Sequence, residues 1–305
     1  MVVRSLLLQL AGSRWLEARA RQNRFSKRLA NRFVAGDSLE EATAPIRALN
    51  AQKIAVSLDF LGESVADARE VEAAECVALQ MLEHIRRERL DANISVKLTA
   101  LGLDIDEGLC RATLSRILNA AGPDMFVRID MEGSPYTQRT LDTCLAMWNG
   151  TPPQRNVGVV IQAYLHRSEG DIKALVGAGV RIRLCKGAYN EPASVAFPHK
   201  HEVDENYLRL SGMLLDSGLY HGFATHDPAM IAGVQRYARE HGIKPDAYEF
   251  QMLYGIRRDL QLALVAEGYR MRVYVPFGTH WYPYFMRRMA ERPANLWFVL
   301  RNMVR

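Results

Sequence analysis

Short apolar runs alternate with stretches of helical length along most of this chain, and this alternation restricts the fold more than any other feature. The runs are rich in Val, Ile, Leu and Phe and are eight in number: 54–58, 94–98, 125–129, 157–161, 180–184, 222–224, 247–250 and 271–275. The stretches between them with helical apolar spacing include 66–87, 107–121, 139–148, 204–215 and 229–241. Strands that alternate with helices predict a parallel sheet, and eight such units are the number that closes a (β/α)8 barrel.

A chain of 305 residues with 49% hydrophobic content can bury a large core, either as two ordinary domains or as one α/β barrel. No long linker or low-complexity segment interrupts the alternation, so we expect one barrel domain at 37–305 after an N-terminal arm at 1–36. The main alternative is an open, doubly wound sheet. Such a sheet usually carries a glycine-rich loop after its first strand, whereas the segment 58–64, LDFLGES, contains a single glycine.

The N-terminal arm differs from the rest of the chain in its charge. Residues 1–36 contain eight basic residues and one acidic residue, a net charge of +7, which leaves −2 for the remainder. With its apolar positions, the arm is typical of an amphipathic helix resting on an anionic membrane surface, which would place a cytoplasmic protein on the inner face of the membrane. Packing on its own domain and an organellar transit peptide are the alternatives.

Other classes of protein are disfavoured by composition. The four cysteines form no CxxC pair and have no short spacing to histidine, which predicts a reduced cytoplasmic protein without a metal site. No apolar stretch approaches the roughly 18 residues of a membrane span, and no signal-peptide pattern is present. Because the basic charge is confined to the arm, nucleic acid is not an expected partner.

The residues at the predicted carboxyl ends of the strands are unusually polar. In a barrel these ends meet at one mouth, where the chemistry is found. A barrel filled only for stability would not need so many ionisable groups there, although mutual pairing, such as Asp130 with Arg183 or Lys97, is the alternative for any one of them. The polar residues in chain order are Asp59, Lys97, Thr99, Asp130, Glu132, Gln162, Tyr164, Lys186, Tyr189, Thr225, His226, Asp227, Glu249, Gln251 and Tyr274.

A second cluster lies in the predicted helix that follows the last strand. Tyr284, Arg287, Arg288 and Glu291 stand at i, i+3, i+4 and i+7 and therefore share one helical face. Two adjacent guanidinium groups suit a small carboxylate ligand, and Glu291 would hold one of them in place. The alternative is a solvated face with an ordinary Arg–Glu pair.

Taken in order, these motifs resemble the proline dehydrogenase family. The motifs are SVKL at 95–98, RIDME at 128–132, IQAY at 161–164, RIRLCKGAY at 181–189, FATH at 223–226, YEFQ at 248–251, VYVPFG at 273–278 and YxxRRxxER at 284–292. The resemblance covers about 54–300 and implies a distorted (β/α)8 barrel that binds FAD, with its last helix over the barrel mouth. The length resembles the short bacterial members, because there is no room for the aldehyde dehydrogenase domain of the bifunctional ones.

The resemblance implies L-proline as substrate, and its carboxylate as the target of the basic residues. Arg287, Arg288 and Lys97 are expected to bind that carboxylate, with Glu291 orienting an arginine.

The resemblance also assigns the residues around the proline ring. Asp130 is implied to be catalytic and to order a hydrogen-bond network near the amine. Tyr274, Tyr284 and Leu253 are expected to wall the ring, with the Tyr274 hydroxyl excluding ring-hydroxylated proline.

Another set of residues resembles the family's flavin site. Arg183 is expected to act in catalysis and cofactor binding, because a nearby cation raises the electron affinity of the flavin ring. The other expected cofactor residues are Met131, Gln162, Lys186, Gly187, Ala188, Tyr189, Thr225 and His226. At Asn190 the sequence departs from the long members of the family, which carry tryptophan there.

The resemblance implies a membrane quinone as electron acceptor, which would give the basic arm a purpose. Two alternatives come from the residues alone. One is an aldolase-type lyase that uses Lys97 or Lys186 as a Schiff-base amine. The other is a non-enzymatic barrel that binds a membrane surface through its arm.

Overall fold

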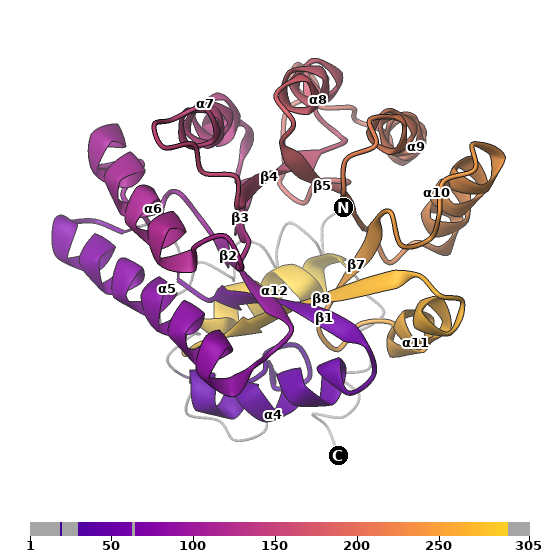
Figure 1. Ribbon diagram of the computed structural model, residues 1–305. Coiled ribbons are helices and arrows are strands. Elements are labelled where there is room, and N and C mark those ends of the chain that lie inside the picture. The colour runs from indigo at the N-terminus through magenta and orange to yellow at the C-terminus, as the bar shows by residue number, and fades with distance from the viewer. Residues whose placement is uncertain (1–18, 20–29, 63–64, 292–305) are drawn as a thin grey trace.

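Eight parallel strands close into a barrel, as Figure 1 shows. The structure is a computed structural model that describes residue 19 and residues 30–62 and 65–291. The predicted (β/α)8 barrel is confirmed, and the open doubly wound sheet is excluded because β1 pairs with both β2 and β8. The strands are β1 (Ile54–Phe60), β2 (Ala92–Val96), β3 (Val127–Ile129), β4 (Val157–Gln162), β5 (Arg181–Cys185), β6 (Gly222–Ala224), β7 (Glu249–Leu253) and β8 (Arg270–Phe277).

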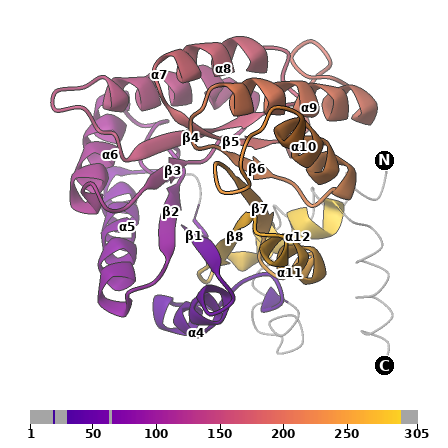
Figure 2. The same ribbon diagram turned by 45° about the vertical axis from the view of Figure 1, so that its right-hand side comes forward.

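Helices cover the outside of the barrel, and Figure 2 shows them as a layer around the strands. Side-chain caps fix the starts of four of them; Asp67, for example, accepts hydrogen bonds from the backbone N–H groups of Arg69 and Glu70 in the first turn of the helix that it precedes. The helices are α4 (Leu39–Asn50), α5 (Ala68–Glu88), α6 (Glu107–Ala121), η1 (Ser134–Tyr136), α7 (Thr137–Trp148), α8 (Ser168–Gly177), α9 (Lys200–Asp216), α10 (Pro228–Glu240), α11 (Arg258–Ala266) and α12 (Trp281–Glu291). None of these helices is long and apolar enough to cross a bilayer, over the ranges that the structure describes.

The apolar core lies between the strands and the helices, while the barrel interior is polar. Along β1, Ile54, Val56 and Leu58 are completely buried in this core. The alternate residues Ser57 and Asp59 are also buried but face the interior, since side chains in a strand alternate between its two faces. A stable outer shell therefore leaves the inner face of the strands available for polar groups.

Two strands are displaced from their predicted positions. The expected strands 94–98 and 247–250 are found as β2 (Ala92–Val96) and β7 (Glu249–Leu253). The apolar pattern is misleading here because Leu98, just after β2, and Tyr248, just before β7, are buried outside the strands. The prediction that Glu249 ends its strand is therefore wrong: it begins β7, at the base of the barrel, opposite the mouth.

Both ends of the described chain lie at the barrel mouth. Figure 1 shows α12 in the centre of the ring of helices instead of within it, and Tyr284 of this helix lines the cavity described below. The expectation that the last helix lies over the mouth is thereby confirmed.

The described end of the arm, residues 30–36, packs on the barrel. The backbone N–H of Ala35 donates to Pro276 at 2.9 Å, and the Phe33 ring lies 6.1 Å from that of Phe285 in α12. Apart from residue 19, the first 29 residues lie outside the described part of the chain.

Candidate active site

A cavity of about 690 Å³ opens at the carboxyl ends of the strands. Most of the residues predicted for the site lie in its wall. They are Lys97, Asp130, Met131, Gln162, Arg183, Lys186, Gly187, Ala188, Tyr189, Thr225, His226, Leu253, Tyr274 and Tyr284. The side chains of Arg287, Arg288 and Glu291 lie outside the described part, although the helix that carries them is in place.

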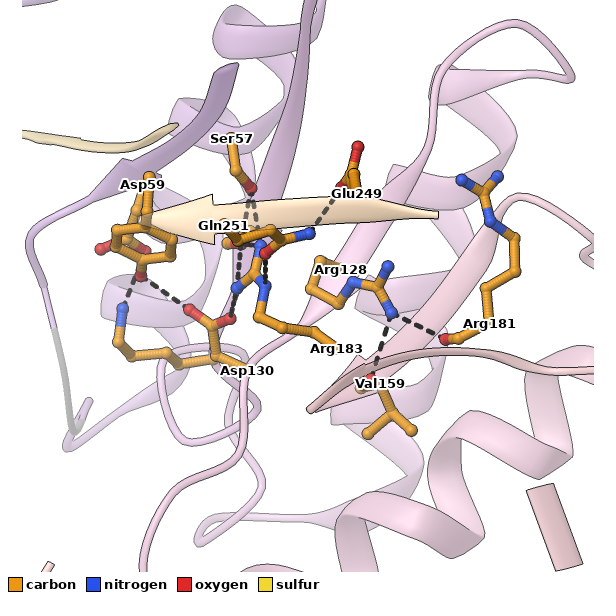
Figure 3. A network of polar contacts seen from close by, with 12 residues as sticks. Ser57, Asp59, Arg128, Asp130, Val159, Arg181, Arg183, Glu249 and Gln251 are labelled. Carbon is orange, nitrogen blue, oxygen red and sulfur yellow. Dashed lines mark hydrogen bonds and ion pairs between the residues drawn. The ribbon is translucent and has the colours of Figure 1, made fainter. Parts of the chain in front are cut away.

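Arg183 stands at the centre of the barrel interior and is only 6% exposed. Its Nη1 donates to Asp130 at 2.8 Å, its Nη2 to Ser57 at 3.0 Å and its Nε to the Gln251 carbonyl at 2.5 Å (Figure 3). These partners come from β1, β7 and the end of β3. The guanidinium group is therefore held in one plane at the floor of the cavity.

Asp130 links this guanidinium group to the upper wall of the cavity. Its second oxygen accepts a 2.7 Å hydrogen bond from the Tyr274 hydroxyl. Burial, together with the carboxylates of Asp130 and Asp59, raises the pKa of Tyr274 well above its ordinary value, so the phenol remains a donor. The three residues form one ordered unit, and the pairing of Asp130 with Arg183, which the sequence offered as an alternative to a functional role, is present within it.

Beside this unit lies a second buried ion pair. The Lys97 amine donates to Asp59 at 2.8 Å, and the two side chains are 11% and 3% exposed. Burial raises the pKa of Asp59 to about 6, against the opposing charge of Lys97 and with the support of the Asp130 carboxylate. An ammonium group and a guanidinium group thus flank the same end of the cavity, where they suit an anionic ligand.

Comparison with known proteins identifies the origin of this arrangement. The family model described as proline dehydrogenase matches residues 42–301. Proline dehydrogenase 2 of Bacillus subtilis is 42% identical over 308 residues, covering 100% of both chains. The proline dehydrogenase of Deinococcus radiodurans is 42% identical over 99% of this chain and 98% of its own. This chain belongs to the proline dehydrogenase family.

Longer members share the barrel. The structure of proline utilization A from Bdellovibrio bacteriovorus inactivated by N-propargylglycine is similar with a TM-score of 0.82 and 26% identity, covering 87% of this chain. The bifunctional protein PutA of Escherichia coli is 29% identical over 90% of this chain. The present chain spans 32% of the first protein and 24% of the second, so the likeness concerns one part of each. The resemblance to the short members of the family is confirmed.

On the β5–β6 side of this proline dehydrogenase family member, the cavity wall is held by ion pairs. The Lys186 amine donates to Asp204 at 2.5 Å and to Asp227 at 2.9 Å. His226 accepts a 2.9 Å hydrogen bond from the backbone N–H of Leu253, which ties β6 to β7 at the mouth.

Gly187 is one of the residues that the resemblance assigns to the cofactor. It lines the cavity and has a φ of +110°, and a Cβ built there would meet the ring of Tyr164 at 2.3 Å. The close neighbour that excludes a side chain is thus a tyrosine of the protein itself.

One buried acceptor in the cavity wall has no partner. The Oε1 atom of Gln162 is buried from solvent and makes no hydrogen bond within the described part of the chain, and the whole residue is only 3% exposed. A buried polar atom of this kind usually has a partner, and leaving it without one costs about 1–3 kcal/mol. Since Gln162 lines the cavity, the missing donor is one that a ligand can supply.

Several wall residues received no role from the sequence. Asp59, Glu132 and Gln251 were recognised as polar strand ends, but nothing in the sequence told their depth in the barrel. Glu132 accepts a 2.6 Å hydrogen bond from the Thr99 hydroxyl, which joins the loops after β2 and β3. Arg257 reaches the wall from the start of α11, where no strand-end signal marks it.

Proposed function

We propose that this chain catalyses the FAD-dependent oxidation of L-proline to Δ1-pyrroline-5-carboxylate, the first step of proline degradation to glutamate. The observation that carries the proposal is the ordered unit of Arg183, Asp130 and Tyr274 on the floor of the cavity, in a chain of the proline dehydrogenase family. The neighbouring Lys97–Asp59 pair adds a cation for a substrate carboxylate.

The cavity wall fits a flavin. When bound, FAD would accept a hydride from the ring carbon beside the proline nitrogen. The orphaned Gln162 acceptor suits an N–H donor of the isoalloxazine ring, and the Arg183 cation favours the charge that the ring gains on reduction. We assign the cofactor to Met131, Gln162, Arg183, Lys186, Gly187, Ala188, Tyr189, Thr225 and His226.

We assign the substrate carboxylate to Lys97 together with Arg287 and Arg288. Proline offers one carboxylate, and paired guanidinium donors bind such a group with fixed geometry. Support comes from the position of Lys97 in the cavity wall and from the placement of α12 over the mouth. In this assignment Glu291 orients one of the two arginines.

The rest of the substrate site follows from the fixed groups. The oxidation would pass the hydrogen of one C–H bond with its electron pair to the flavin, release the N–H proton to solvent and leave a C=N double bond. Asp130 holds the Tyr274 hydroxyl and the Arg183 guanidinium group in place for this step, so neither side chain can rotate freely. Tyr274, Tyr284 and Leu253 all line the cavity and would form the wall against the apolar ring.

Neither lysine favours the aldolase alternative. A Schiff-base lysine must offer a neutral amine. Lys97 instead donates to Asp59, and Lys186 donates to both Asp204 and Asp227. The family assignment also points away from the non-enzymatic alternative.

The domain division at residue 36 and the role of the arm belong to the same proposal. We propose that the arm, residues 1–36, brings the barrel to an anionic membrane surface, where a quinone accepts the electrons. Residues 30–36 pack on the barrel, so the test removes only residues 1–29. Deletion of residues 1–29 should abolish binding to vesicles containing anionic lipid and leave proline oxidation by a soluble dye intact. Undiminished vesicle binding would refute the membrane role.

The central experiment is an absorbance spectrum of the purified protein. We expect a flavin spectrum that bleaches when L-proline is added and persists when D-proline is added. An Arg236→Met variant on the exposed face of α10 serves as a control and should behave as the parent. A flavin spectrum that L-proline leaves unchanged would overturn the substrate assignment, and a colourless protein would favour the lyase.

A further inference from the structure

The side-chain amide of Gln251 contacts the Arg183 guanidinium group, and the proposed function gives this amide no role. The side-chain amide oxygen of Gln251 accepts from Arg183 Nε at 2.5 Å, whereas Asp130 accepts from a different nitrogen of the same group, Nη1. Gln251 is 4% exposed and lies on β7. Without this acceptor, Arg183 would keep its bonds to Asp130 and the two serines but lose the contact that defines its tilt.

The orientation of that amide is in turn set by Glu249. The Gln251 amide nitrogen donates to Glu249 Oε1 at 2.6 Å, and Figure 3 shows Gln251 between Glu249 and Arg183. A flipped amide would direct its NH2 group at the guanidinium donors and its oxygen at a carboxylate, and both contacts are repulsive. The carboxylate therefore selects the one orientation that presents an acceptor to Arg183.

Glu249 is suited to this task because it is ionised and immobile. Burial alone would raise the pKa of Glu249, but the charge of Arg272 and hydrogen bonds from Arg272, Gln251 and Tyr220 outweigh it, so the pKa lies below the ordinary value. Arg272 Nε donates to it at 2.8 Å and the Tyr220 hydroxyl at 3.0 Å. A permanent carboxylate is thus anchored at the base of the barrel.

The neighbouring strand leaves the space that this amide needs. A Cβ built on Gly222 of β6 would lie 2.3 Å from the Gln251 amide nitrogen and 2.9 Å from its Cδ. Any larger residue would displace the amide. A substitution at Gly222 would therefore move the Gln251 amide without changing any charged group.

We infer that Glu249 and Gln251 are positioning residues for Arg183: the carboxylate fixes the amide, and the amide fixes the guanidinium group that faces the reacting centre. The inference rests on the proposed function, since the group that responds to Arg183 is the flavin. Consecutive hydrogen bonds link Arg272 to Glu249, Glu249 to Gln251 and Gln251 to Arg183, so they connect the base of the barrel to its mouth. The orientation of the charge, as well as its presence, determines how strongly the flavin is stabilised when reduced.

The test compares Glu249→Gln and Gly222→Ala with the parent holoenzyme. Glutamine at 249 keeps the size of glutamate but loses the charge paired with Arg272 and replaces one acceptor oxygen with an NH2 donor, so it holds the Gln251 amide less firmly. The readout is the flavin midpoint potential, titrated with dithionite. We expect each variant to make flavin reduction about tenfold less favourable, a decrease of about 30 mV for a two-electron couple. The control is Glu75→Gln, which breaks an exposed Arg–Glu pair between α5 and α6.

The outcomes separate positioning from a purely structural role. Loss of thermal stability or FAD content with an unchanged potential in both variants would overturn the inference. If Glu249→Gln does not fold, Gly222→Ala decides alone, because it alters neither charge nor hydrogen-bonding groups. The proposed function fails separately: it is refuted if L-proline does not bleach the flavin of the parent protein. The potentials can still be compared in that case, because dithionite and not proline reduces the flavin in the titration.

Discussion

At the base of the barrel interior guanidinium groups stack on aromatic rings away from the cavity, whereas at the mouth Arg183 lies 5.3 Å from the Tyr274 ring and also lines the cavity. The Phe126 ring lies 4.7 Å from the Arg128 guanidinium carbon and 4.4 Å from that of Arg181. The Tyr220 ring lies 4.9 Å from the Arg181 guanidinium carbon and, towards solvent, 5.7 Å from that of the exposed Arg270. Such stacks stabilise charges within the protein and leave their faces covered.

The mouth has a similar density of charge but a different purpose. Arg183, Lys97, Asp59 and Asp130 are paired with one another, yet all four also line the cavity. Arg128, Arg181 and Glu249 at the base do not appear in its wall. The lesson is that ionisable residues inside a barrel do not mark a site by their number. Access to a cavity distinguishes the functional end.

The largest expected difference between the two ends concerns Arg183 and Arg181, which lie one layer apart on β5. Arg183→Met should lower kcat/KM for proline by roughly 100- to 1000-fold, the usual effect of removing a donor that stabilises developing charge. Arg181→Met should cost about 1–2 kcal/mol of unfolding free energy through its lost stacking and leave kcat/KM nearly unchanged. Steady-state kinetics and urea unfolding of both variants provide the measurement. Equal kinetic losses would contradict the distinction between the ends.

A smaller effect is expected from the helix over the mouth. Arg287→Met and Arg288→Met should each raise the KM for proline roughly 10- to 100-fold, which corresponds to losing about 1.5–3 kcal/mol of hydrogen bonding to a charged group. FAD content, read from the visible absorbance, should stay as in the parent. Arg236→Met, exposed on α10, is the matched control. Unaltered proline affinity in both variants would exclude the clamp.

At the base, a buried neutral histidine should make the protein sensitive to acid. His221 is 1% exposed and accepts from the Ile182 N–H, and burial lowers its pKa to about 3. Between that value and about 6.5 the unfolded chain binds the extra proton, so stability falls as pH falls. The loss should reach about 2 kcal/mol at pH 5.

Urea unfolding at several pH values measures this effect. His221→Asn keeps an acceptor for Ile182 and should flatten the pH dependence between pH 5 and 6.5. The same substitution at the exposed His241 should leave the slope unchanged. Identical slopes in the parent and His221→Asn would show that the base histidine is not the source.

At the mouth the pH dependence should have the opposite sign for stability. The pKa of Asp59 is raised from 3.8 to about 6, so the stability that it contributes is present below 3.8 and is lost as pH rises through 6. Activity should instead rise with pH, because the ionised carboxylate holds Lys97 beside the cavity. The pH profile of kcat/KM should show a limb near pH 6 with a slope of about tenfold per unit.

Asp59→Asn tests the assignment of that limb. The variant should lose the limb and reach a plateau about tenfold below the parent, as expected for one charged hydrogen bond. A limb near pH 6 that persists in Asp59→Asn would assign it to another group. Asp91→Asn, exposed beside β2, is the control and should retain both the limb and the plateau.

The sequence by itself determined the barrel and most of the residues that line its mouth. Apolar alternation reveals strands and helices because burial on the outer face of each strand is a local requirement. Motif order then identified the family and placed Lys97, Asp130, Arg183 and Tyr274 near one another.

Only the tertiary structure decided the depth of each polar residue and its partners. Glu249 was wrongly expected at the mouth, and Asp59 and Gln251 had no role, because strand register depends on pairing between segments far apart in the chain. The same register pairs Gly222 with Arg183 on one side and with Glu249 on the other, and the Gln251 side chain lies over Gly222 and reaches Arg183. Such contacts join β5, β6 and β7 across the barrel interior, and no local pattern of residues encodes them.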